Sequence, residues 1–168
     1  MKQILETSRL ILREMEPSDL GFIADLLGNA EVMRYWPKCY SREESKEWLL
    51  KQLERYLKDG YGYWLVLEKE TNQPVGQAGL LSMKIDSRKE IGLGYIIHHQ
   101  FWKKGFATEA ASACIQYAFQ KLNKSRVIAL IRPENELSQK VAHKLLMLPV
   151  GFTEYAGFNH LIFAIEKH

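Results

Sequence analysis

Cysteine is scarce in this chain of 168 residues, which contains only Cys39 and Cys114. Two cysteines so far apart do not build a disulfide framework, and the CxxC and HExxH spacings of common metal sites do not occur. Cys114 falls on the apolar face of a predicted helix, so we expect it to be a buried free thiol. The sequence therefore predicts no metal site and a reducing setting.

Long apolar runs, repeats and low-complexity segments are also missing. The opening stretch, MKQILETSRLILRE, is interrupted by charges, so we expect neither a signal peptide nor a membrane anchor. The net charge is +3, from 23 basic and 20 acidic residues, and this excess is too small to indicate nucleic-acid binding. We expect one cytoplasmic domain, residues 1–168, with no membrane or nucleic-acid partner.

Hydrophobic periodicity and cap signals divide the chain into helices and strands. One helix is expected after Pro17. A longer one follows the capping box that begins at Ser41, with Trp48 and Leu57 on its apolar stripe, and an alanine-rich helix follows Gly105. The expected strands are 9–13, 61–68, 75–83, 91–97, 126–131 and two short runs within 152–165.

A last helix is expected after Asn135, because Leu137, Leu145 and Leu148 recur at helical spacing. Pro149 would end it. Meander strands followed by β-α-β units predict an α/β fold, in which a mixed sheet carries helices on both of its faces.

The most informative stretch is a basic turn between a β-type run and the alanine-rich helix. It reads Trp102-Lys-Lys-Gly-Phe-Ala107. The first N–H groups of a helix have no internal partner, and the helix dipole adds partial positive charge there. Two lysines add full charges, and Gly105 has no Cβ to hinder a ligand. The turn therefore predicts a phosphate or pyrophosphate site.

Four landmarks, taken in order, carry a resemblance to a known family. They are ETSRLILREMEPSDL at 6–20, WKKGFATEA at 102–110, NELS at 135–138, and KL at 144–145 with GF at 151–152. With these, the chain resembles the GNAT acetyltransferases, in the group that includes the ribosomal-protein N-terminal acetyltransferases. That resemblance implies a mostly antiparallel, twisted central sheet that splays between its fourth and fifth strands.

The resemblance also implies acetyl-CoA as cofactor. The pyrophosphate would lie on backbone amides of Lys103, Lys104, Gly105, Phe106, Ala107 and Thr108. The pantetheine would pair along Ile96, Ile97 and His98, where Gly92 and Gly94 favour a bulge or a close ligand approach, with mere strand weakening as the alternative. Further contacts would come from Asn135, Ser138 and Lys144. For Asn135, helix capping alone is the alternative explanation.

The chain departs from the family pattern at three places. Trp102 stands where the wider superfamily has Gln or Arg, and Lys103 replaces a customary Gly, so that backbone position must tolerate a side chain. About five extra residues, 146–150, follow the KL landmark and are expected to lengthen or distort the end of the last helix.

The predicted catalytic residues are Ser138 and Glu90. By resemblance, the Ser138 hydroxyl would protonate the departing thiolate; the alternative is an ordinary first-turn serine. Many superfamily members have a tyrosine where this helix has Ala142. Glu90 would accept the amine proton, with Glu109 as its rival. The alternative for Glu90 is a solvated carboxylate at the end of a strand. The alternative for Glu109 is a carboxylate that interacts with the helix dipole.

Tyr35 and Trp36 lie in a loop that borders the acceptor site in the family, so they are expected to bind the substrate or to plug the core. The sequence thus predicts an N-acetyltransferase in which a primary amine, such as a protein N-terminus, attacks acetyl-CoA directly in a ternary complex. A small-molecule or antibiotic acetyltransferase and a non-catalytic CoA-binding module remain alternatives. The C-terminal strands would suit a homodimer.

Overall fold

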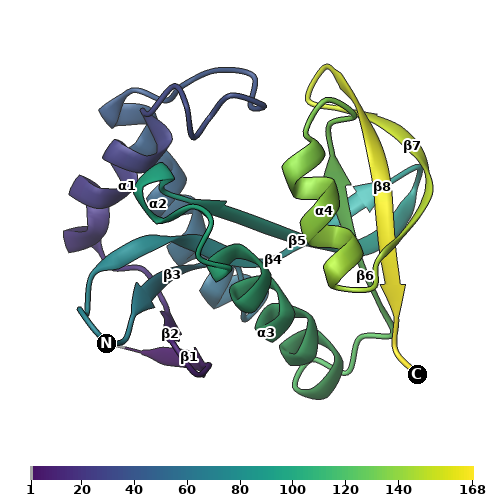
Figure 1. The fold of residues 1–168 in the computed structure, drawn as a ribbon, viewed down its shortest axis with the longest axis horizontal. Coiled ribbons are helices and arrows are strands. Elements are labelled where there is room, and N and C mark those ends of the chain that lie inside the picture. Colours follow the sequence, from purple (N-terminus) through teal and green to yellow (C-terminus); the bar gives the residue numbers. More distant parts are fainter. Residues whose placement is uncertain (1) are drawn as a thin grey trace.

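The computed structural model describes residues 2–168 and shows one mixed sheet with helices on both faces (Figure 1). The strands are β1 (Gln3–Glu6), β2 (Leu10–Arg13), β3 (Tyr63–Glu68), β4 (Pro74–Ile85), β5 (Arg88–Ile97), β6 (Arg126–Ile131), β7 (Leu148–Tyr155) and β8 (Phe158–Glu166). They lie in the order β1-β2-β3-β4-β5-β6-β8-β7, and each neighbouring pair is antiparallel except β5 with β6. The predicted fold class is confirmed.

Four α-helices cover the sheet: α1 (Leu20–Leu27), α2 (Arg42–Lys58), α3 (Phe106–Gln120) and α4 (Glu136–Lys144), with short 3-10 turns η1 (Pro17–Asp19) and η2 (His99–Phe101). On one face, Ile23 of α1 and Leu49 of α2 pack against Ile96 of β5. On the other, α3 and α4 contribute Cys114 and Ala142 to a second core. In both cores, apolar side chains of the helices pack against apolar side chains of the sheet. Burial of these side chains holds the layers together.

The sheet opens between β5 and β6. Within residues 2–168 these parallel strands pair only at Gly92 and Ile128. Beyond that point Figure 1 shows β5 and β6 diverging, with α4 and the β7–β8 hairpin beyond the gap. The part of β5 that follows Gly92 therefore has backbone N–H and C=O groups on this edge that do not pair with β6. Such groups need other partners, which a ligand can supply. The splay expected between the fourth and fifth predicted strands is confirmed, since these are β5 and β6.

Local signals placed most element boundaries correctly. The Ser41 capping box is present, because its hydroxyl accepts from Glu44 N (3.1 Å) and the Glu44 carboxylate accepts from Ser41 N (3.0 Å). Asn135 caps α4 by accepting from Ser138 N at 3.1 Å. Cys114 is buried and unpaired, as predicted, while Cys39 is exposed. These features depend on neighbours in the sequence or on one apolar face.

Three expectations were wrong. The strand Gln3–Glu6 went unrecognised, although it pairs antiparallel with β2. Leu57, placed on the buried stripe of α2, is 91% exposed. The last helix does not reach Leu148 and Pro149; it ends at Lys144, and both residues belong to β7.

The reason for the early helix end lies in the extra residues. Leu146 has φ +65°, a left-handed conformation that a helix cannot continue through. The pairing of β7 with β8 then shifts register between Pro149 and Gly151. The inserted residues therefore distort the helix end, as expected, and also start an irregular edge strand. Leu148 and Phe152 on it are exposed. The homodimer stays a prediction.

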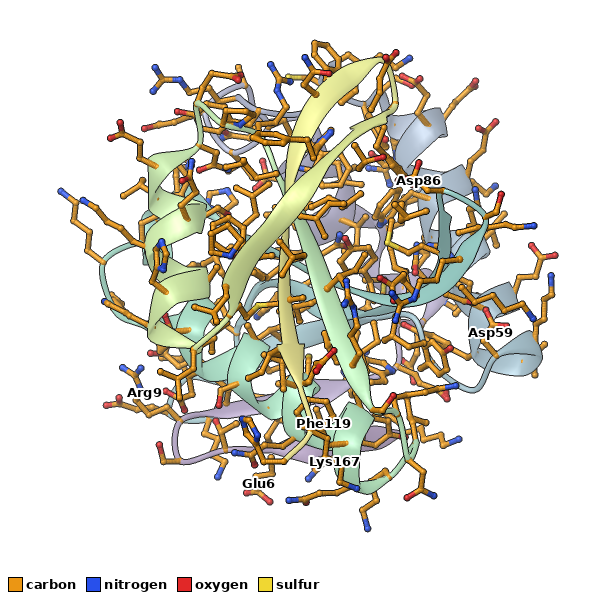
Figure 2. All side chains as sticks on the ribbon, turned by 90° about the vertical axis from the view of Figure 1, so that its right-hand side faces the viewer. Glu6, Arg9, Asp59, Asp86, Phe119 and Lys167 are labelled. Atoms are coloured by element: carbon orange, nitrogen blue, oxygen red, sulfur yellow. The ribbon has the colours of Figure 1, made fainter. Side chains whose placement is uncertain are left out.

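Figure 2 shows the C-terminus tied to α3, where the Lys167 ammonium lies beside Phe119 and donates to its carbonyl oxygen at 3.1 Å. This contact anchors the end of β8, next to β6, at the base of the sheet. Among residues 2–168 no helix is both long and apolar enough to cross a membrane.

Candidate active site

A cavity of about 360 Å³ occupies the opening between β5 and β6. Leu93 and Gly94 of β5 line one wall, and Ile131 of β6 lines the other. The remaining lining comes from α2, β3, β4, the loop before α2, the start of α4 and the tip of the β7–β8 hairpin. A concave site lined by aromatic side chains and a set of polar groups is a typical place for small-molecule chemistry.

Two hydroxyl groups bridge the opening. Ser138 Oγ donates to Tyr95 Oη at 3.2 Å, and Tyr95 Oη donates to the Ser138 carbonyl oxygen at 3.3 Å. Burial raises the pKa of Tyr95, and the hydrogen bond from Ser138 opposes that rise only in part, so the phenol stays protonated at neutral pH. Both side chains line the cavity. Tyr95 was not recognised from the sequence, because only the three-dimensional split brings it to α4.

The expected substrate residues Tyr35 and Trp36 do line the cavity. Trp36 also packs edge-on against Trp48 of α2, with ring centroids 5.8 Å apart, so it belongs partly to the core as well. Trp48 in turn lies 5.4 Å from the ring of Tyr63. An aromatic wall thus extends from the loop to β3. Trp48 and Tyr63 looked like ordinary core residues in the sequence.

One histidine lies among the lining residues. His160 of β8 has Nδ1 2.9 Å from the carbonyl oxygen of Phe158. Because a carbonyl oxygen can only accept, Nδ1 must carry the proton, and in the neutral ring Nε2 keeps a free lone pair. The imidazole is therefore in the tautomer that can accept a proton.

The bulge expected at the glycines of β5 is absent, while a close ligand approach there stays a prediction. The pairing of β4 with β5 is continuous, without a bulge. A Cβ on Gly94 would lie 1.9 Å from Tyr63 Oη, and one on Gly92 would lie 2.2 Å from Met83 Sδ. The close approach is therefore made by side chains of β3 and β4, and substitution of either glycine would displace them.

The basic turn lies at the N-terminus of α3, as predicted. Gly105 is the N-cap with φ +80°, and a Cβ there would meet only Arg9, at 3.3 Å. Lys103 has φ +65°, so it adopts the left-handed conformation that favours the glycine it replaces. Phe106, Ala107 and Thr108 form the first turn of α3. The Trp102 indole donates to Ile97 O at 2.7 Å.

Arg9 and Glu109 hold this turn from outside. Arg9 donates to the Lys104 carbonyl oxygen at 2.8 Å, and its guanidinium lies 4.7 Å from the Phe106 ring centroid. Glu109 accepts from Thr7 Oγ1 at 2.6 Å and from Arg9 Nε at 2.7 Å. The β1–β2 turn thus fixes the N-terminus of α3. Glu109 is engaged there and is not among the residues that line the cavity.

The other predicted residues occupy varied positions. Ile96 and Ile97 are buried in opposite cores, so only their backbone is available to a ligand. His98 is buried, with Nε2 3.1 Å from Asp25 Oδ2. Lys144 is exposed at the opposite end of α4 from Asn135.

Glu90 is buried between arginines. Its carboxylate lies 3.3 Å from Arg126 Nε and 3.8 Å from Arg88 Nε, and it is not among the residues that line the cavity. Because this carboxylate does not reach the cavity, it is not placed to take a proton from an amine bound there. The imidazole of His160 is better positioned for that task. Within residues 2–168, no group of three or more His, Cys, Asp or Glu side chains could hold a metal ion.

A mixed sheet that splays beside a helix N-terminus, with a cavity at the splay, is an arrangement that suits an acyltransferase. Comparison with known proteins names the family. The model of the acetyltransferase (GNAT) domain matches residues 9–147, most of the chain. The protein therefore belongs to the GNAT family of N-acetyltransferases, which use acetyl-CoA as the acetyl donor.

Curated relatives support this assignment. The chain is 33% identical to the uncharacterized protein YkkB of Bacillus subtilis over 149 residues, covering 87% of this chain and 86% of that one. It is 31% identical to the uncharacterized N-acetyltransferase YoaA of the same organism, covering 90% and 84%. It is 29% identical to spermidine N(1)-acetyltransferase of Escherichia coli, covering 90% and 77%.

Solved structures share the fold. An acetyltransferase of the GNAT family from Bacillus anthracis superposes with a TM-score of 0.82 at 24% identity, covering 96% of this chain and 97% of that one. RimL, a ribosomal L7/L12 α-N-protein acetyltransferase in complex with coenzyme A, superposes with a TM-score of 0.80 at 16% identity and 98% coverage of each chain. Ribosomal-protein acetyltransferases are thus among the structural neighbours, as the sequence landmarks indicated.

Proposed function

We propose that this protein transfers the acetyl group of acetyl-CoA to a primary amine by direct attack in a ternary complex. The observation that carries the proposal is that one cavity holds both a hydroxyl pair at the split strand edge and an imidazole with a free lone pair. The hydroxyl pair can donate a proton to the leaving thiolate, and the imidazole can accept a proton from the attacking amine.

The donor side would be built mostly from backbone. The N–H groups of 103–108 at the start of α3 suit a pyrophosphate, since they are unpaired and lie at the positive end of the helix dipole. The open turn at Gly105 fits this role because almost nothing occupies the space above it. The unpaired edge of β5 near Ile96 and Ile97 suits the extended pantetheine arm. Asn135 and Ser138 approach the same arm from α4.

The chemistry needs a neutral amine and a protonated leaving group. The pKa of a lysine-type amine is near 10.4 and that of an α-amine is near 8. A general base is therefore more necessary for a lysine-type amine than for an α-amine. His160 Nε2 would take the proton as the N–C bond forms and the C–S bond breaks. The Ser138 hydroxyl, which donates to Tyr95 Oη in this structure, would turn its proton to the departing thiolate, and the serine oxygen would recover a proton, through water, from the imidazolium formed at His160. Tyr95 acts as a positioning residue, because its own proton is committed to the Ser138 carbonyl oxygen.

Release of CoA thiol with a panel of amines tests this proposal. Ser138→Ala should lower kcat by about tenfold to a hundredfold while CoA affinity, measured by calorimetry, changes little. Tyr95→Phe keeps the ring but removes the partner of Ser138, so a smaller fall in kcat is expected. An unchanged kcat in Ser138→Ala would remove the serine from the mechanism and leave water as the proton donor.

The acceptor is defined here only as a primary amine. Named relatives act on spermidine and on the α-amine of a ribosomal protein, and both of these acceptors are primary amines. A protein N-terminus and a small-molecule amine are therefore both compatible with the proposed reaction.

A further inference from the structure

The proposed acceptor side of the cavity is lined by aromatic side chains and by positively charged ones. Its rings come from Trp36 and Tyr40 before α2, Trp48 of α2, Tyr63 of β3, and Tyr155 and Phe158 at the hairpin tip. Three cationic side chains, those of Lys51, Arg55 and Arg132, also line it. Among residues 2–168, no aspartate or glutamate belongs to the lining. The side chains that line the site therefore carry an excess of positive charge beside several aromatic rings.

One of the three cations is already neutralised. Arg132 lies 2.9 Å from a Glu134 carboxylate oxygen, packs 4.0 Å from the Phe158 ring centroid and donates to Tyr35 O at 3.3 Å. These contacts tie the end of β6 to the hairpin tip and to the loop before α2. Arg132 therefore closes the far side of the cavity and leaves little charge for a ligand.

The other two cations have no such partner. Lys51 and Arg55 lie one helical turn apart on α2, on the face that also carries Trp48. Neither forms an ion pair with a carboxylate in the described part of the chain. Arg55 is nonetheless fixed, because it donates to Gln52 Oε1 at 3.2 Å, and the fully buried Gln52 also accepts from Tyr63 N at 3.0 Å. The chain thus holds an unpaired guanidinium at the cavity.

We infer that the acceptor is an aromatic primary amine that also carries an anionic group. The aromatic wall would hold its ring, and Lys51 with Arg55 would bind its anion. The same cations lower the pKa of a bound ammonium, which favours the nucleophilic neutral amine. A polyamine would bring further positive charges into a cavity without carboxylates. This inference depends on the proposed acetyl transfer and narrows its substrate.

Two sources share this chemistry. One is a free aromatic amino acid, whose carboxylate lies next to the amine. The other is a peptide with an aromatic N-terminal residue followed by an acidic one. Tryptophan and an N-terminal Phe-Asp peptide represent them in the test.

The experiment measures kcat/KM by CoA thiol release. L-tryptophan is compared with tryptamine, which lacks the carboxylate, and with tryptophanamide, which is uncharged there but has a weakly basic amine. The Phe-Asp peptide is compared with its Phe-Lys counterpart, and spermidine is included. We expect kcat/KM for L-tryptophan or for the Phe-Asp peptide to exceed that of its matched compounds by about tenfold or more. Whichever pair shows the effect identifies the source.

The double variant Lys51→Gln, Arg55→Gln should remove most of that preference through a rise in KM for the anionic acceptor. Lys46→Gln, on the same helix but away from the cavity, should leave it unchanged. If tryptamine, tryptophanamide or spermidine is the best acceptor, or if the preference survives in the double variant, the inference is overturned while acetyl transfer stands. If no amine releases CoA, the proposed function fails and the inference fails with it.

Discussion

Replacing Glu109 with glutamine should loosen the anion-binding turn. The Glu109 carboxylate accepts from Thr7 Oγ1, Arg9 N and Arg9 Nε at 2.6, 3.0 and 2.7 Å, and Arg9 Nη2 lies 2.7 Å from Oε2. In Glu109→Gln one oxygen remains, but an NH₂ group faces the Arg9 donors. A hydrogen bond to a charged group contributes about 1.5–3 kcal/mol, and the pair must be discounted because the Arg9 side chain is 47% exposed.

We therefore expect a loss of about 2 kcal/mol, which corresponds to a fall in Tm of about 4–8 °C for a chain of this length. Differential scanning calorimetry of both proteins measures it. Arg9→Met alone and together with Glu109→Gln completes a double-mutant cycle that separates the pair from the rest of the contacts.

The effect should depend on pH in a defined direction. Burial raises the pKa of Glu109, but hydrogen bonds from Thr7 and Arg9 outweigh it and hold the pKa below its ordinary value. A carboxylate with a lowered folded-state pKa stabilises the fold above its unfolded pKa, about 4.3, and this contribution is lost as pH falls through the folded value. The difference between wild type and Glu109→Gln should hold from pH 7 to about pH 5 and shrink below that. A difference that grows on acidification would refute the argument.

Three further predictions concern other parts of the site. Gly105→Ala should lower stability by about 1–2 kcal/mol in thermal unfolding, because φ is +80° there, and should weaken CoA binding in calorimetry; unchanged values would show that the turn relaxes. His160→Gln should lower kcat/KM by about a hundredfold for an acceptor amine with pKa near 10.4 and by less for one near 8; equal losses would remove the imidazole as base. A thiol reagent should label only Cys39 in the native protein, since burial raises the pKa of the Cys114 thiol; labelling of Cys114 without denaturant would contradict the described core.

Features that depend on near neighbours in the sequence were predicted well. The Ser41 capping box, the Asn135 cap and the Gly105 turn each involve groups within about four residues, so their sequence signals are complete. The apolar faces of α2 and α3 were predicted for the same reason, apart from Leu57, which is exposed near the end of α2. The fold class followed from the order of these elements.

The end of the last helix shows where such reasoning fails. Leu137, Leu145 and Leu148 have helical spacing, but residues 146–150 also form a short continuous apolar run, which fits a strand as well as a helix. The left-handed turn at Leu146 decides between them, and a leucine gives no signal for that conformation. Tertiary pairing of β7 with β8 overrides the local pattern.

The site residues that were missed gave no recognisable signal in the sequence around them. Tyr95 meets Ser138 only because β5 and β6 diverge, and Arg9 reaches Glu109 from the β1–β2 turn. His160 showed no motif of its own, because its tautomer is set by a backbone carbonyl in the hairpin. Conversely, Glu90 attracted attention by its place at the start of a strand, whereas its partners Arg88 and Arg126 hold it away from the cavity.

This contrast follows from how the two halves of the site are built. The proposed donor half uses backbone groups of one turn and one strand edge, so it depends on conformation and leaves a short sequence signature. The acceptor half uses side chains from α2, β3, β8 and the loop before α2, which any of several residues can supply without altering the fold. Substitutions at Lys51 or Arg55, which touch no donor-side element, can therefore change the acceptor while the acetyl donor stays the same. The identity of the acceptor must be sought in those side chains, because the shared fold and the turn signature concern only the donor.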